Sequence, residues 1–291
     1  MPSWITKLTE GLADWLRPFI KSDIIELFSA VDQTIGEARG EAVLSPDAWN
    51  PEAYALIHAI SESVIVPVGG LIISMVLCFE ILSLITDRNN MKDIDYLDVI
   101  RVILKAAIGA LFMANATTII MAIFALGAFV ADSTGGVIGG VTSLAAHQDE
   151  INLLVDADLA ARGCGELIVM LFEVNLIRLL LRAASFIIWV ILCARMIEIY
   201  LYASIAPIPF ATVTSTRFNI GDHYGKNIFA LAFQGFFILL VLGIYSVVIH
   251  SYHAAGSLEG QIWSLLGYTL LLALMLLRSG SIARSVFGAG G

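Results

Sequence analysis

One uninterrupted stretch decides the fold: ELIVMLFEVNLIRLLLRAASFIIWVILCARMIEIYLYASIAPIPF, residues 166–210. From Glu166 to Ala206 it contains neither Gly nor Pro, the two residues that most often interrupt a helix. At 1.5 Å per residue, a helix of that length measures about 60 Å, roughly twice the hydrocarbon thickness of a bilayer. Its second half, residues 183–206, is long and apolar enough to span a membrane. The stretch therefore predicts one long helix, part of which lies outside the bilayer.

Two charged residues, Arg195 and Glu198, lie in the middle of this apolar half. Charges at membrane depth are costly and usually face a partner or a water-filled interior. Residues three apart are neighbours on a helix surface, and the long Arg195 side chain can reach the depth of Glu80 in the first expected span. We expect Glu80, Arg195 and Glu198 to form an intramembrane charge group. This group could lock helices together, line a hydrated path or relay protons, and the sequence leaves these alternatives open.

The composition sets the class of protein. Of the 291 residues, 58% are hydrophobic and 14% are charged, whereas soluble domains contain about 25% charged residues. Several continuous runs of about 20 apolar residues indicate an all-α polytopic membrane protein and exclude a β-barrel, whose strands alternate in polarity. The net charge of −9 comes without the basic stripe that direct nucleic-acid binding needs, although DNA could still pass through an assembled pore.

The first 60 residues form an amphipathic region rather than a span. Apolar side chains at helical spacing form one stripe along its first half, with charged residues elsewhere, and the segment is too charged to cross a bilayer. Trp4 and Trp15 favour the level of the lipid headgroups. Such a segment lies at the membrane interface, packs on partner helices or docks on its own domain, and these alternatives stay open. We expect an N-terminal helical region, residues 1–60, and a transmembrane domain, residues 61–291.

About five transmembrane helices are expected in the second region. Asn115 lies near the centre of the second span and breaks its apolar run. Lys and Arg gather after the first, third and fifth spans, which places the N-terminus outside and the C-terminus in the cytoplasm. The expected spans are residues 64–86, 102–131, 183–206 within the long helix 166–206, 227–250 and 261–277.

Two further groups are candidates for a subunit contact and for a pore. Arg178 and Arg182 stand on one face of the long helix, where they extend to lipid headgroups or contact a neighbouring subunit. The connector after the second span contains STGGVIGG, and an apolar, Gly-rich backbone at membrane depth is tolerated only where it is buried in protein or lines a cavity. This segment is either a constricting loop or a surface connector, and its glycines are Gly135, Gly136, Gly139 and Gly140.

Nothing in the sequence points to catalysis. The chain contains no Walker A, GxSxG, HExxH or CxxC motif, and its three cysteines are too few for a disulfide framework. We therefore expect a protein that is not an enzyme, with no catalytic residues, no metal site and no cofactor.

Four segments together resemble a known family. They are VIVPVGGLIISMVLCFEILSLITDRNNMKDID at 64–95, APIPFATVTSTRFN at 206–219, NIFALAFQGFFILLVLGIYSVVI at 227–249 and LLRSGSIARSVF at 276–287. The chain is similar to the TrbL-type polytopic subunit of type IV secretion systems, in the short form found in conjugative elements of Gram-positive bacteria. The similarity covers about residues 45–288, and FEILSLITDRNNM with SIAPIPFAT is its most distinctive combination.

The resemblance implies a channel subunit of the bacterial plasma membrane. Such subunits assemble as a homo-oligomeric ring with other secretion subunits, including the ATPases, and contact membrane lipids. They help to pass single-stranded DNA with its attached relaxase. Two other classes stay open: a secondary transporter that uses Glu80, Arg195 and Glu198 as coupling residues, and a non-conducting membrane scaffold. The lack of a visible inverted repeat argues against the transporter.

Overall fold

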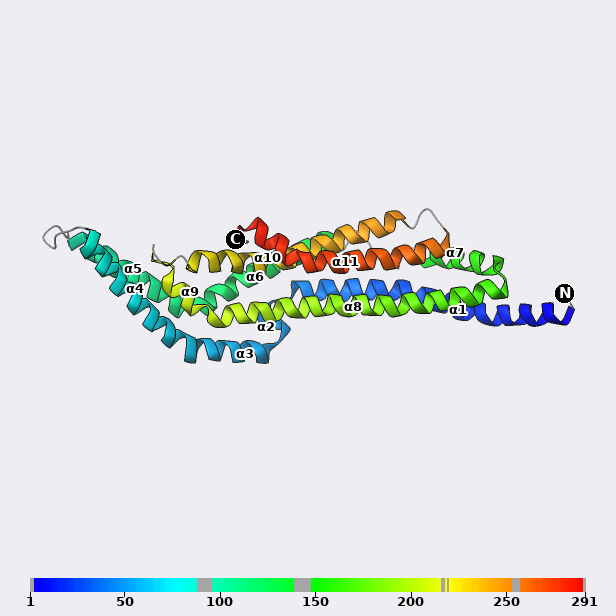
Figure 1. The fold of residues 1–291 in the computed structure, drawn as a ribbon, viewed down its shortest axis with the longest axis horizontal. Coiled ribbons are helices and arrows are strands. Elements are labelled where there is room, and N and C mark those ends of the chain that lie inside the picture. Colours follow the sequence, from blue (N-terminus) through cyan, green and yellow to red (C-terminus); the bar gives the residue numbers. More distant parts are fainter. Residues whose placement is uncertain are drawn as a thin grey trace. The chain divides into compact units, whose positions relative to one another are not determined.

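The computed structural model describes residues 3–87, 96–138, 148–215, 218, 220–252 and 257–289, and helices make up nearly all of these residues (Figure 1). Within these ranges there is no β-strand. A short π-helix, η1 (Ser61–Ile65), joins α3 to α4. The α-helices are α1 (Ser3–Val43), α2 (Pro46–Trp49), α3 (Pro51–Ile60), α4 (Val66–Asp87), α5 (Tyr96–Ala114), α6 (Ala116–Ile138), α7 (Gln148–Ala161), α8 (Cys164–Ile205), α9 (Pro207–Thr212), α10 (Ile220–Tyr252) and α11 (Leu258–Val286).

In the described part of the chain, five helical stretches are long and apolar enough to cross a membrane. This number and the all-helical structure confirm the predicted class, a polytopic α-helical membrane protein. The five stretches are Pro51–Thr86, Ala116–Ile138, Cys164–Ile205, Ile220–Ile249 and Leu258–Val286.

The long helix expected at residues 166–206 is α8, which has 42 residues. Ala206 separates it from the short helix α9, which begins at Pro207, as suits a residue whose nitrogen cannot donate a hydrogen bond. Buried residues recur along α8 at intervals of three and four, so one continuous face packs inside the protein. In the first part of α8 these residues are Leu167, Met170, Val174, Ile177, Leu181, Ala184 and Ile188.

The stretch expected as the second span, residues 102–131, is divided at Asn115 into α5 and α6. The Asn115 side-chain amide donates to the carbonyl of Leu111 at 2.9 Å, and this carbonyl also accepts from the Asn115 backbone N–H at 3.2 Å. Such a side chain inserted into the backbone hydrogen-bond ladder is a recognised cause of helix bending. The helix that is apolar enough to span therefore begins only after Asn115 and extends to Ile138.

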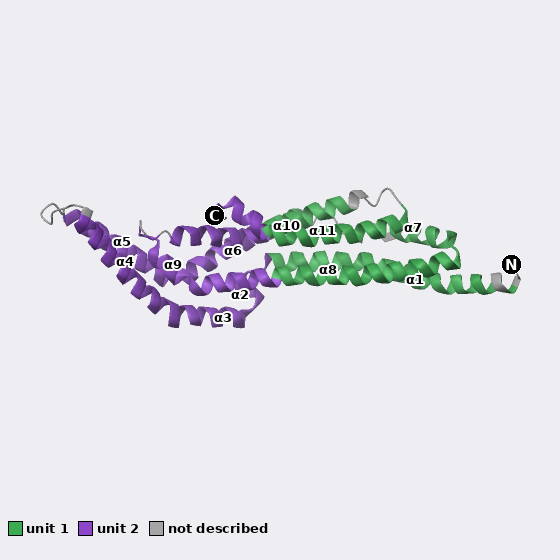
Figure 2. Cartoon of the chain, in the orientation of Figure 1, with its two compact units in different colours: residues 1–42, 132–192, 237–279 green, residues 43–131, 193–236, 280–291 purple. Residues whose placement is uncertain are grey.

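The chain forms two units of packed helices (Figure 2). Unit 1 contains residues 1–42, 132–192 and 237–279, and unit 2 contains residues 43–131, 193–236 and 280–291. In unit 1, α1 lies beside the first part of α8 (Figure 1).

Helix α1 has two apolar faces. Leu16 and Ile20, which the sequence pattern joins to one stripe with Trp15 and Phe19, are buried in unit 1. Trp15 and Phe19 point outward, with 60% and 52% of their surface exposed. The helix therefore docks on its own domain through one face and keeps a second apolar face free. The exposed face in the first turns consists of Trp4, Leu8, Leu12, Trp15 and Phe19.

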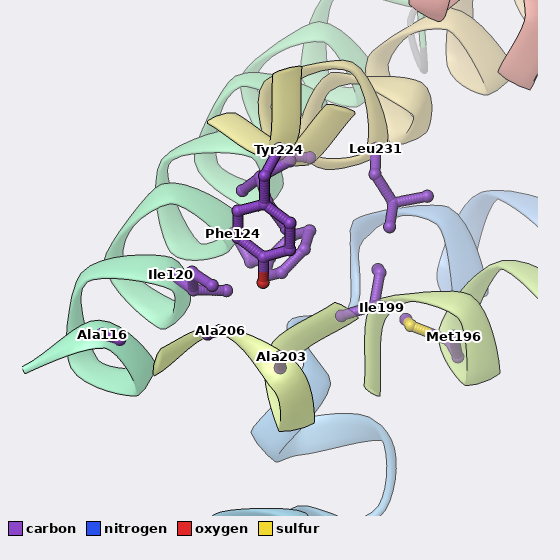
Figure 3. Packing of buried hydrophobic residues seen from close by; sticks show 11 residues of the cluster. Ala116, Ile120, Phe124, Met196, Ile199, Ala203, Ala206, Tyr224 and Leu231 are labelled. Carbon is purple, nitrogen blue, oxygen red and sulfur yellow. The ribbon is translucent and has the colours of Figure 1, made fainter. Parts of the chain in front are cut away.

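The core of unit 2 is formed where α6, α8 and α10 meet (Figure 3). Small residues let the helices approach closely, and Gly127 of α6 is the clearest case. A Cβ atom at Gly127 would lie 2.4 Å from the carbonyl oxygen of Ala232 in α10. The buried cluster consists of Ala116, Ile120, Phe124, Met196, Ile199, Ala203, Ala206, Tyr224, Ile228, Leu231 and Ala232.

Replacing Gly127 with Ala should therefore push α6 away from α10. We expect Gly127→Ala to lower the free energy of unfolding by about 1–3 kcal/mol, the usual cost of overpacking. Gly136→Ala on the same helix is the control, because a Cβ atom there meets no atom within 4 Å. Thermal unfolding in detergent compares the two variants, and equal stability would contradict the close packing of α6 on α10.

Candidate functional site

Charged side chains join α1 to α8 within unit 1. Arg178 of α8 pairs with Asp23 of α1, and its guanidinium also lies 3.1 Å from Glu26. The Arg182 guanidinium lies 3.8 Å from the other carboxylate oxygen of Glu26. The Arg178 and Asp23 side chains are only 21% and 22% exposed, whereas Arg182 is 72% exposed. Removing one partner of a shielded pair leaves the other charge poorly solvated, so Arg178 is the more important of the two arginines for holding α1 in place.

A hydroxyl pair fixes the register of the two helices further along. The Thr34 and Ser185 hydroxyl oxygens are 2.8 Å apart. Since Asp23 meets Arg178 and Thr34 meets Ser185, residue numbers rise in the same direction along both helices. Helices α1 and α8 are therefore parallel in this region (Figure 1).

A groove of about 170 Å³ lies between α1 and α8 at this level. Leu27, Ala30 and Leu181 form part of its apolar lining. At its edge, the Gln33 amide donates to the Glu37 carboxylate at 2.7 Å. Its remaining lining is largely polar and includes Glu26, Gln33, Thr34, Glu37, Arg182 and Ser185.

Helix α7 is attached to α1 by a second set of polar contacts. Lys21 pairs with Asp156 at 2.6 Å, and the Arg17 guanidinium donates to the backbone carbonyl of Leu159 at 3.1 Å. Just after α7, Arg162 donates to Asp158 at 2.6 Å, and this hydrogen bond raises the pKa of the Arg162 guanidinium. The α1 helix is thus held by charge on both α7 and α8.

Two members of the predicted intramembrane charge group have contacts outside that group. Glu198 pairs with Arg284 near the end of α11, and Glu80 accepts a hydrogen bond from Ser215 at 3.2 Å. Arg195 is only 5% exposed, so it lies in the protein interior. A contact between Glu80 and Arg195 stays a prediction.

The two arginines expected to meet lipid headgroups or a neighbouring subunit differ in their surroundings. Arg178 is engaged within its own chain by Asp23 and Glu26. Arg182 keeps most of its side chain exposed, and its contact with a neighbouring subunit stays a prediction.

The expected glycine loop is partly helical. Gly135 and Gly136 lie near the C-terminal end of α6 rather than in a loop. Gly139 and Gly140 lie outside the described residues. Gly-rich sequence can remain helical, since an isolated Gly costs a helix only about 1 kcal/mol relative to Ala. A constriction formed by these glycines stays a prediction.

Two groups of partners were missed by the sequence reasoning. The acids of α1, Asp23 and Glu26, are three apart, and Arg178 and Arg182 are four apart, so the two pairs match in charge and in helical spacing. That complementarity is a signal that sequence reasoning could have used. No comparable signal links Glu198 to Arg284, because they lie 86 positions apart on different helices.

The chemistry available to these groups is electrostatic. Among the described residues, no group of three or more His, Cys, Asp or Glu side chains could hold a metal ion. The charged side chains hold helices together or face outward, and the groove beside α1 presents carboxylate, amide, hydroxyl and guanidinium groups. This arrangement suits helix packing and contact with water or a polar partner.

The comparisons with known proteins include a match to a family model. A family model described as TrbL/VirB6 plasmid conjugal transfer like protein matches residues 31–207, which is more than half of the chain. The match begins within α1 and ends at Pro207, so the resembling segments at 227–249 and 276–287 lie beyond it. No curated protein and no solved structure matches the chain.

The α1–α8 ion pairs give a first stability prediction. We expect Arg178→Ala to lower the free energy of unfolding by about 1–3 kcal/mol, because it leaves the Asp23 carboxylate without its partner. The control Arg182→Ala removes an exposed charge and should change stability by less than about 0.5 kcal/mol. Thermal unfolding in detergent measures both, and an equal loss in the two variants would contradict the role of Arg178.

The Glu198–Arg284 pair can be tested by exchanging its charges. Glu198→Arg places two guanidinium groups together and should lower stability by about 1–3 kcal/mol. The double variant Glu198→Arg with Arg284→Glu restores an ion pair and should recover at least half of that loss. Unfolding in detergent and protein level in membranes report the result. No recovery in the double variant would mean that the two residues do not act as a pair.

Proposed function

We propose a function on the basis of family membership. The chain belongs to the TrbL/VirB6 plasmid conjugal transfer like family. It is therefore a component of a conjugal transfer system, and the five apolar helices found among its described residues make it a membrane protein. The family is a structural component of conjugation rather than a known enzyme family.

Within such a system, the proposed role is a channel-forming or scaffold subunit of a type IV secretion machine. In this role it assists the passage of single-stranded DNA with its attached relaxase across the bacterial plasma membrane. Family membership carries the proposal. The length of α8 supports it, because a 42-residue helix has room both to cross a bilayer and to contact other subunits outside it.

The proposed assembly is a ring of several copies, in contact with other secretion subunits, among them the ATPases that supply energy. Exposed Arg182 is the proposed contact with a neighbouring copy, and Gly135, Gly136, Gly139 and Gly140 are the proposed constriction. The exposed aromatic face of α1 supports a contact with lipid, since Trp favours the headgroup level.

The proposed orientation has the N-terminus outside and the C-terminus in the cytoplasm, as the distribution of Lys and Arg favours. The charges at Glu80, Arg195 and Glu198 are proposed to lock helices rather than to relay protons. The Glu198–Arg284 ion pair supports a locking role for Glu198.

Deleting the gene for this chain from its conjugative element tests the proposed function. We expect DNA transfer to recipient cells to fall below detection and to return when the chain is supplied from a second site. Nicking of the DNA by the relaxase should be unchanged, because that step precedes transport. Normal transfer without the chain would contradict the proposal, and loss of nicking would indicate a role upstream of the channel.

A further inference from the structure

The outward face of α1 changes from apolar to polar along the helix. Its first turns expose apolar side chains, as described above. From residue 26 onward the same side of the helix carries polar groups, because positions 26, 33 and 37 continue the helical spacing of positions 4, 8, 15 and 19. Glu26, Gln33 and Glu37, here called the α1 polar face, are all exposed.

The neighbouring part of α8 is apolar at the same level. The Thr34–Ser185 contact places residue 34 of α1 beside residue 185 of α8. Because the helices are parallel, Glu37 lies about 5 Å further along, beside position 188. Residues 183–192 of α8 contain no charge, and Phe186 and Trp189 in this segment are 63% and 53% exposed.

The α1 polar face and the apolar surface of α8 thus lie side by side in unit 1 but require different surroundings. Exposed Phe186 and Trp189 favour hydrocarbon, which is consistent with the membrane-spanning character of α8. A carboxylate at that depth is costly unless it faces water or a polar partner. The groove beside Gln33 and Glu37 has about 170 Å³ of space and is lined in part by polar side chains, and this space is enough for several water molecules.

We propose that the α1 polar face lines a water-filled path that enters the membrane at the level of residues 183–192 of α8, while Phe186 and Trp189 on α8 face lipid. This inference deepens the channel role and rests on it, since the path would be enclosed by several copies of the chain. The face carries two carboxylates, with Arg182 at the edge of the groove. Affinity for a nucleic-acid backbone grows with the number of phosphates neutralised by Lys and Arg, so this face would let a polyanion pass without binding it tightly.

Cysteine accessibility tests the proposal in membranes that contain the assembled transfer system. In a chain whose Cys78, Cys164 and Cys193 are replaced by Ala, single variants carry Gln33→Cys or Glu37→Cys. The matched controls are Phe186→Cys and Trp189→Cys at the same level. The probe is a charged methanethiosulfonate reagent that cannot cross membranes, and mass spectrometry follows its attachment. We expect the two α1 positions to react at least about tenfold faster than the two α8 positions, because the hydrated thiolate attacks the reagent and displaces its sulfinate, whereas a thiol in hydrocarbon stays protonated.

Each other outcome overturns the proposal. Slow labelling at all four positions means that the α1 polar face is sealed from water. Fast labelling at all four means that residues 183–192 of α8 lie outside the hydrocarbon. A disulfide between two copies at Gln33→Cys, without labelling, means that the face is a contact between copies. The labelling rate does not depend on DNA transfer, so failure of this inference is distinguishable from failure of the proposed function.

Discussion

The parallel pairing of α1 with α8 is the constraint on which the rest of unit 1 depends. Arg178 holds the two helices together through Asp23 and Glu26, and the Thr34–Ser185 contact sets their register. This register aligns the polar second half of α1 with an uncharged segment of α8. Ion pairs thus hold α1 against α8. The same register places the polar groups of α1 beside a segment of α8 that is apolar enough to span a membrane.

Local features of the sequence were sufficient to predict the class of protein and the long helix. Composition predicts a polytopic helical membrane protein, and the absence of Gly and Pro from Glu166 to Ala206 predicts α8. The sequence shows that Asn115 interrupts an apolar run, but it does not show that the spanning helix begins only after this residue. The Asn115 side-chain amide donates to the Leu111 carbonyl, which also accepts from the Asn115 backbone N–H. The helix is interrupted there, and the spanning helix begins after Asn115.

The pairing of Glu198 with Arg284 could not be predicted in the same way. Glu198 meets Arg284 because unit 2 brings the end of α11 against α8, and no pattern near either residue indicates this. The sequence pattern also shows one apolar stripe along α1, whereas the structure has two apolar faces there. Helical spacing shows which residues share a face, but only the packing shows that Leu16 is buried while Trp15 is not.

The charges of the chain divide into two groups by their surroundings. Asp23 with Arg178, and Glu198 with Arg284, are paired within the chain and connect helices. Glu37 and Arg182 face outward. In a membrane protein the first group stabilises the fold, and the second requires water or a polar partner. A conjugation subunit without catalytic motifs can thus contribute to transport through the surfaces that it offers.

The register of α1 against α8 is the central claim, and an engineered disulfide tests it most directly. In a chain without native cysteines, Thr34→Cys with Ser185→Cys should cross-link on mild oxidation in membranes, because the two hydroxyl oxygens are 2.8 Å apart. The pair Thr34→Cys with Leu192→Cys shares the same face of α8 but is offset by about 10 Å, too far for a disulfide. We expect a cross-link in the first pair and none in the second. A cross-link in the second pair only, or in neither, would contradict this register of α1 against α8.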